Sequence, residues 1–311
     1  MPHSPGIHHV TAIARDAQAN VAFYTDVLGL RMVKKTVNYD DPATYHLYYG
    51  DEDGHPGTIL TFFPWANMPL ARRGAGETGE VAFIIPPAAV AFWLDRLSAL
   101  HVPHDVPEKR FGETRIALRD PDGIRLVLVA RPGAEALPGR AAAGVGAEQS
   151  IRGFAGTTLV LARQGPTAQV LEIAFGWRKT GEEGRFQRYA APDGVIGNQI
   201  DLELAEDARQ AGMGPGSVHH VAFRAADDAA QAAMAEALRG VGVQTTEQKE
   251  RNYFRSVYFR EPGGVIFEIA TDDPGFAIDE TRETLGQKLM LPPWLEAERG
   301  RIEAALPTLE R

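Results

Sequence analysis

The chain contains no cysteine, which excludes disulfides, thiolate metal sites and a cysteine nucleophile. A metal bound here would depend on histidine and carboxylate ligands. No run of about 18 apolar residues could span a membrane as a helix, and the N-terminus has no basic segment followed by an apolar one. These absences predict a cytoplasmic protein without a membrane partner.

An excess of positive charge is also absent. The 311 residues include 32 Lys and Arg against 41 Asp and Glu, which gives a formal net charge of −9. Nucleic-acid-binding domains normally carry a basic face, so we expect no nucleic-acid partner. Hydrophobic residues at 44% and charged residues at 23% are typical of a globular protein with a buried core.

One sequence unit occurs four times, and we call each copy a module. GIHHVTAIARD, from Gly6, aligns without a gap with GFAGTTLVLAR, from Gly153. Two further copies begin at Gly79 and Ser217, and both end in a similar hairpin sequence, RDPDGIRLVLVAR and REPGGVIFEIATD. The hydrophobic pattern of each module predicts a strand, an amphipathic helix and three further strands joined by Gly and Pro turns.

The expected fold is therefore α+β, with four βαβββ modules forming two concave, barrel-like sheets. The modules cover residues 6–64, 78–131, 151–204 and 216–272. Residues 132–150 are rich in Ala, Gly and Pro and are the predicted linker between a first domain (6–131) and a second domain (151–272). Residues 273–311 predict a loop and a helix that pack over the modules.

Strand alternation distinguishes the two histidines of each HHV motif. In SVHHVAFRA, the apolar Val221 and Phe223 are in phase with His219 and should face the helix. His220 then faces the open side of the sheet. The equivalent residue of the first module is His9.

Glu268 is an acid in an otherwise apolar strand, GGVIFEIAT, and alternation places it on the open side. A three-residue turn at 262–264 would put Tyr258 opposite Glu268. The second and third modules carry other residues at the positions of His220, His9 and Glu268: Glu80, Gly156 and Val127. The fold itself therefore does not require these two histidines and the acid.

Two imidazoles and one carboxylate on a concave face form a facial triad, which is typical of non-haem Fe(II) enzymes. A lone histidine more often has a structural role, but HHV in two equivalent strands favours a metal site. We expect one Fe(II) per chain at His9, His220 and Glu268, with Mn, Zn or Ni able to replace it in purified protein. Asp201 and Glu203 could serve a second site, but they have no histidine partner.

The three candidate ligands come from the first and fourth modules. Neighbouring modules would ordinarily pair, but metal–ligand bonds of about 2 Å cannot bridge two separate sheets. We therefore expect the first module to share a sheet with the fourth, and the second with the third.

The modules resemble the vicinal oxygen chelate superfamily, which includes glyoxalase I, fosfomycin-resistance proteins, bleomycin-binding proteins and extradiol dioxygenases. GIHHVT, YHLYYGDEDGHPGTILTFFP, RFGETR, SVHHVAF, RNYFRSVYFREPGGVIFE and LGQKLMLPP resemble the hydroquinone ring-cleaving dioxygenases, such as dichlorohydroquinone dioxygenase. The resemblance covers nearly the whole chain. It implies an Fe(II)-dependent, extradiol-type dioxygenase that takes O2 and a small aromatic substrate, either a hydroquinone or a catechol-like phenol. A homo-oligomer is compatible with it.

The resemblance also assigns residues. The family's metal ligands fall on His9, His220 and Glu268. Tyr258 and Arg251 correspond to the residues that lie near the substrate oxygen; without the resemblance they are simply a half-buried strand aromatic and a solvated residue.

The family further implies supporting positions beside the ligands for His8, Thr11 and His219. Strand alternation agrees for Thr11 but not for His8 or His219, unless a bulge turns them inward. His46 and His55 are expected to be structural or surface residues.

Two alternatives remain. One is a metal-dependent isomerase or transferase of the glyoxalase type, whose sites usually have a fourth protein ligand or a thiol substrate. The other is a resistance protein that binds an aromatic compound without turnover.

Overall fold

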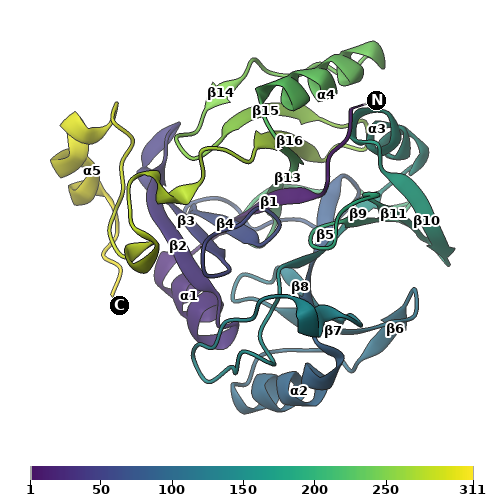
Figure 1. Ribbon diagram of the computed structural model, residues 1–311, viewed down its shortest axis with the longest axis horizontal. Helices are drawn as coiled ribbons and strands as arrows, with labels where there is room; N and C mark the ends of the chain where they lie inside the picture. The colour runs from purple at the N-terminus through teal and green to yellow at the C-terminus, as the bar shows by residue number, and fades with distance from the viewer. Residues whose placement is uncertain (1, 311) are drawn as a thin grey trace.

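The computed structural model describes residues 2–310, which form two curled sheets of eight strands each (Figure 1). The first sheet contains, in order across it, β14 (Lys249–Glu250), β15 (Arg255–Arg260), β16 (Ile266–Thr271), β13 (Val218–Ala225), β1 (Ile7–Ala14), β4 (Ile59–Pro64), β3 (Asp41–Gly50) and β2 (Arg31–Asn38). The second contains β10 (Arg178–Glu183), β11 (Phe186–Ala190), β12 (Gln199–Leu204), β9 (Phe154–Leu161), β5 (Glu77–Ile85), β8 (Arg125–Ala130), β7 (Glu113–Arg119) and β6 (Glu108–Arg110).

This strand order confirms the predicted pairing of modules. The first sheet joins the first and fourth modules through an antiparallel pair, β1 and β13, and the second joins the second and third through β5 and β9. Backbone hydrogen bonds link the sheets to each other, from Ile7 N–H to Gly197 O (2.8 Å) and from Phe154 N–H to Gly57 O (2.8 Å).

Each module contributes one helix after its first strand: α1 (Ala17–Ala22), α2 (Val90–Ala99), α3 (Gly165–Phe175) and α4 (Asp228–Gly240). Asp16 and Asp227 cap α1 and α4, because their side chains accept hydrogen bonds from the backbone N–H three residues on. Helices α3 and α4 lie side by side (Figure 1). Within residues 2–310, none of the helices is both long enough and apolar enough to cross a membrane.

The two faces of the first sheet are packed differently. The helix side carries the main core, to which Val221, Phe223 and Phe267 belong, as alternation predicted. The open side holds a smaller apolar cluster that includes Tyr48 and Phe254. That cluster lies in a concave surface that can enclose a ligand.

The registers of β1 and β13 contain two bulges. Ile7 lies opposite Phe223 and His9 opposite Ala222, so His8 is an extra residue in β1. Thr11 lies opposite His220 and Ala12 opposite Val218, so His219 is an extra residue in β13. A bulge residue interrupts the regular alternation of side chains.

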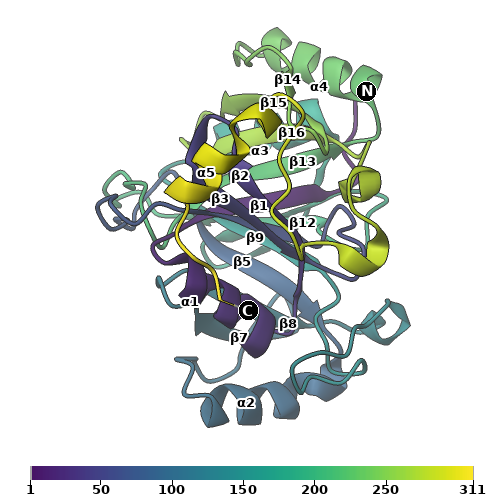
Figure 2. The same cartoon turned by 90° about the vertical axis from the view of Figure 1, so that its left-hand side faces the viewer.

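The C-terminal segment lies against the first sheet. Its helix α5 (Arg299–Ala305) is beside β3 (Figure 2). Lys34 on β2 is fully buried, and its Nζ lies 2.6 Å from Asp279 and 2.6 Å from Glu280 in this segment. The Tyr253 ring packs over the same ammonium group, with 4.8 Å between Nζ and the ring centroid.

Replacing Lys34 should destabilise the protein. Lys34→Met removes one partner of a buried ion-pair cluster and leaves two carboxylates facing each other, a change that typically costs about 3 kcal/mol. Urea unfolding would measure the loss. The control is Lys109→Met, which alters an exposed lysine of β6 and should leave the unfolding midpoint unchanged. Equal midpoints for both variants would contradict the predicted role of Lys34.

Candidate functional site

Three buried side chains converge on the open face of the first sheet. His9 Nε2 lies 3.2 Å from His220 Nε2 and 3.4 Å from Glu268 Oε2. His220 Nε2 lies 2.9 Å from Glu268 Oε2. They stand on three adjacent strands, β1, β13 and β16. The structure thus brings together the three residues that the sequence proposed as metal ligands.

The chemistry of these donors fits a divalent cation. Glu268 Oε2 is buried and accepts no hydrogen bond from the described residues, although both Nε2 atoms lie close to it. A buried carboxylate oxygen without a donor is costly unless a cation neutralises it. Burial lowers the pKa of His220, which keeps the imidazole neutral and able to bind metal. Although burial alone would raise it, His9 and His220 hold the pKa of Glu268 well below its usual range.

The first histidine of each pair supports the second. His8 Nδ1 lies 2.9 Å from His9 Nδ1, and His219 Nδ1 lies 2.8 Å from His220 Nδ1. One nitrogen of each pair donates and the other accepts, so the Nδ1 atoms are occupied and the Nε2 atoms remain available to a metal.

These contacts overturn the argument from alternation, which placed His8 and His219 on the helix side. Because each is the extra residue of a bulge, both histidines of a pair reach the open face. His8 and His9 both pack against Phe254, with ring centroids 5.1 and 5.0 Å away.

Tyr258 lies opposite Glu268 in the β15–β16 pair, as the turn length predicted. Ser256, two residues earlier on β15, donates its hydroxyl to Glu268 Oε1 at 2.5 Å, a role that sequence reasoning missed. Arg251 Nε donates to the Tyr258 hydroxyl at 3.3 Å, and its Nη2 lies 2.9 Å from Asp40 Oδ2. Burial, reinforced by the nearby Glu268, raises the pKa of Tyr258 above its usual value, so the phenol stays protonated.

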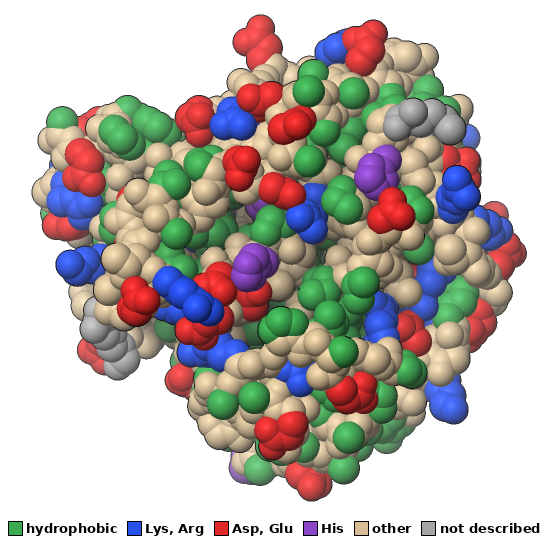
Figure 3. Space-filling model, in the orientation of Figure 1, with side chains coloured by type: hydrophobic (Ala, Val, Ile, Leu, Met, Phe, Trp, Pro, Cys, Tyr) green, Lys and Arg blue, Asp and Glu red, His purple; other side chains and the backbone are tan. Residues whose placement is uncertain are grey.

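A cavity of about 480 Å³ opens at the triad. Its lining includes His9, His220, Arg251 and Tyr258 together with apolar and aromatic side chains, Tyr39, Phe63, Trp65, Phe254 and Ile266. A small aromatic molecule fits a cavity that is lined by aromatic side chains and a few polar groups. The outer face seen in Figure 3 carries acidic and basic side chains interspersed, without a basic patch that would suit nucleic acid.

His46 and Tyr48 of β3 also line this cavity. His46 Nδ1 lies 2.8 Å from the Tyr48 hydroxyl, and its Nε2 lies 2.8 Å from Thr61 Oγ1, which is 2.8 Å from Thr11 Oγ1. His46 is thus hydrogen-bonded, as expected of a structural residue, but it belongs to the cavity wall. The alternation of YHLYY, which puts residues 46 and 48 on the open side, was the available signal. His55 lies at the surface, as expected, with Nδ1 2.7 Å from Asp51.

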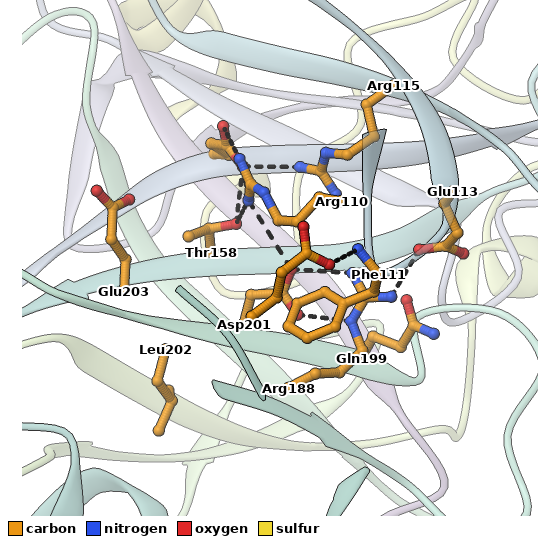
Figure 4. A network of polar contacts seen from close by, with 12 residues as sticks. Arg110, Phe111, Glu113, Arg115, Thr158, Arg188, Gln199, Asp201, Leu202 and Glu203 are labelled. Atoms are coloured by element: carbon orange, nitrogen blue, oxygen red, sulfur yellow. Dashed lines mark hydrogen bonds and ion pairs between the residues drawn. The ribbon is translucent and has the colours of Figure 1, made fainter. Parts of the chain in front are cut away.

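The second sheet has a salt-bridge network at the equivalent place (Figure 4). Glu80, at the position of His220, lies 2.9 Å from Arg110, 2.8 Å from Arg115 and 3.0 Å from Arg125. Although burial raises it, Arg115 and Arg110 lower the pKa of Glu80 to about 2. A larger cavity, of about 660 Å³, lies here, but Glu80, which lines it, is already neutralised by arginine. Among the described residues, the single group with suitable metal-ligand geometry is the triad of the first sheet.

The sequence matches the Glyoxalase/Bleomycin resistance protein/Dioxygenase superfamily over residues 6–128 and 168–269. Because these stretches make up more than half of the chain, the protein belongs to this superfamily, which confirms the resemblance seen in the modules. MhqO of Bacillus subtilis, provisionally named a ring-cleaving dioxygenase, is 47% identical over 305 residues, covering 98% of this chain and 96% of its own. The chlorohydroquinone/hydroquinone 1,2-dioxygenase of Sphingobium indicum is 34% identical over 303 residues, covering 96% and 94%.

Solved structures share the fold. A crystal structure from Bacillus subtilis, provisionally titled a dioxygenase, is 45% identical and aligns with a TM-score of 0.94 over 100% of this chain and 99% of its own. Maize glyoxalase I, at 13% identity and a TM-score of 0.64, covers 86% of this chain and 92% of its own. Its similarity concerns the architecture alone.

Loss of any triad residue should weaken metal binding. His9→Ala, His220→Ala and Glu268→Ala each remove one of three donors, and we expect the affinity for Fe(II) to fall about 100-fold or more. Elemental analysis after anaerobic loading would measure it. Unaltered protein should hold one ion per chain, and the surface control His55→Ala should match it. Two ions per chain, or full loading of a triad variant, would contradict the assignment.

Proposed function

We propose that the protein is an Fe(II)-dependent ring-cleaving dioxygenase that acts on a hydroquinone. The observation that carries the proposal is the convergence of His9, His220 and Glu268 at a cavity walled by aromatic side chains. The names of the relatives at 47% and 34% identity support the same reaction class. A cytoplasmic location, with O2 and a small phenol as the partners, is part of the proposal.

Fe(II), when bound by the triad, supplies open coordination positions where a phenol oxygen and O2 can meet and exchange electrons. The Arg251 guanidinium stabilises negative charge on the substrate oxygen, because it carries a fixed positive charge in a partly buried position. The protonated Tyr258 hydroxyl can donate a hydrogen bond to that oxygen or pass it a proton. The side chains of Phe63, Trp65 and Phe254 enclose the ring and exclude water.

The described residues bring three donors together, whereas a glyoxalase-type isomerase usually has a fourth protein ligand. This count favours the dioxygenase over that alternative. Shared architecture with maize glyoxalase I carries no weight here, because one fold hosts many reactions.

The proposed activity is tested by oxygen consumption. Protein loaded anaerobically with Fe(II) should take up one O2 per molecule of hydroquinone, with loss of the aromatic absorbance. Catechol, assayed in parallel, separates the two substrate classes, and protein without metal is the blank. Tight hydroquinone binding without any oxygen uptake would instead indicate a binding protein.

Removing the Tyr258 hydroxyl should slow turnover without loss of metal. Tyr258→Phe keeps the ring and its packing, so we expect kcat to fall by about 100-fold if the hydroxyl serves in proton transfer. The iron content, measured in the same samples, should equal that of unaltered protein. Unchanged turnover with several quinols would reduce Tyr258 to a packing residue.

A further inference from the structure

The site is built around an approximate two-fold relation between the first and fourth modules. In the antiparallel pair β1–β13, His9 lies opposite Ala222, and Thr11 lies opposite His220. Exchange of the two strands therefore maps His9 onto His220 and Thr11 onto Ala222. The strand order agrees, because β4 and β3 extend from β1 as β16 and β15 extend from β13.

The relation continues outward along both arms of the sheet. Thr11 pairs with Thr61 on β4, and Ala222 pairs with Glu268 on β16, so Thr61 is the counterpart of the metal-site carboxylate. Tyr48 lies opposite Thr61, and Tyr258 lies opposite Glu268. Tyr48 on β3 is thus the counterpart of Tyr258 on β15.

The residues two positions before each tyrosine, Ser256 and His46, also correspond to each other. Ser256 bonds to Glu268 Oε1 at 2.5 Å, and His46 bonds to Thr61 Oγ1 at 2.8 Å. His46 also contacts the Tyr48 hydroxyl at 2.8 Å. Both tyrosines line the cavity, and they stand on β15 and β3, which lie on opposite sides of the central β13–β1 pair in the sheet. On β3 the tyrosine is coupled to an imidazole.

This second tyrosine is a competent hydrogen-bond acceptor. Burial lowers the pKa of His46 well below its usual value, so the imidazole is neutral and one of its nitrogens accepts. When Tyr48 donates to His46 Nδ1, the His46 Nε2–H donates to Thr61, and Thr61 donates to Thr11. The Tyr48 oxygen then keeps a lone pair for a ligand hydroxyl.

We propose that the Tyr48–His46 pair binds the second hydroxyl of a 1,4-dihydroxybenzene whose first hydroxyl lies at the triad beside Tyr258. The proposal rests on the proposed function and adds to it the residues that bind the second hydroxyl of the substrate. A para-diol carries its polar groups at opposite ends of the ring, which matches tyrosines on the two arms of the sheet in a cavity that is also lined by apolar side chains. A catechol has both hydroxyls at one end and would leave Tyr48 without a partner, which costs affinity.

Binding measurements test the inference independently of catalysis. Fe(II)-loaded protein is titrated with hydroquinone and with phenol under anaerobic conditions, using calorimetry. Phenol lacks only the second hydroxyl, so the ratio of the two dissociation constants reports the contact between that hydroxyl and Tyr48. We expect hydroquinone to bind about tenfold more tightly than phenol, the effect of one buried hydrogen bond.

Tyr48→Phe should bring this ratio close to one, with phenol affinity and iron content unchanged. His46→Gln, which removes the imidazole, should lower the ratio as well and serves if the first variant does not fold. The matched control is Tyr49→Phe, since the Tyr49 hydroxyl is also buried but bonds to Asn20 on the helix side at 2.9 Å. It should keep the original ratio.

The outcomes separate this inference from the proposed function. A ratio that persists in Tyr48→Phe, or falls equally in Tyr49→Phe, would overturn the inference even if hydroquinone is cleaved. A ratio that is lost in Tyr48→Phe supports the inference even if no oxygen is consumed; the protein would then bind para-diols without cleaving them.

Discussion

The antiparallel contact between β1 and β13 is the interaction on which the site depends. It joins segments 211 residues apart in sequence, and it sets His9 Nε2 3.2 Å from His220 Nε2. Glu268 reaches the same point because β16 runs parallel to β13. Each donor stands on a strand rather than on a loop, which holds the geometry in place before any ligand binds.

Much of this arrangement could be predicted from the sequence. The repeated HHV motif and the acid in VIFEIA identified His9, His220 and Glu268, and the short reach of a metal–ligand bond required the first and fourth modules to share a sheet. The orientation of His8 and His219 could not be derived in this way, because strict alternation assumes an unbroken strand. The bulges are a property of the fold: in the second sheet the register shifts at Gly79 and Ala155, where no histidine is present.

Sequence reasoning missed the roles of Ser256 and His46 for a different reason. The turn at 262–264 set the register of β15 against β16, but the Ser256–Glu268 bond is diagonal and does not follow from that register alone. The longer connection between β3 and β4 leaves the register of His46 against Thr61 undetermined in the sequence. Alternation in YHLYY places His46 on the open side, but its hydrogen-bonding role is not apparent until Thr61 is seen beside it.

The two sheets show alternative ways of filling one concave surface. In the second sheet, Glu80 is neutralised by three arginines, so the charge is satisfied within the protein. In the first sheet, Glu268 has histidines beside it, and its Oε2 atom is buried without a hydrogen bond. Because a buried carboxylate oxygen without a partner is costly, an external cation would stabilise it. The same backbone therefore supports an internal salt bridge in one copy and a candidate metal site in the other.

The departure from two-fold symmetry in the first sheet has its own consequence. If Thr61 were an acid like its counterpart Glu268, two carboxylates would cancel the charge of a divalent ion. With a single carboxylate, a divalent ion bound by the triad would keep a net positive charge, which would favour an anionic phenol oxygen over a neutral one. The hydroxyl of Thr61 instead forms a hydrogen bond with His46. The β4–β3 side of the cavity therefore carries neutral hydrogen-bonding groups in place of a carboxylate. In the proposed function, Glu268 and its histidines would thus bind the charged end of the substrate, and Tyr48 would bind a neutral hydroxyl.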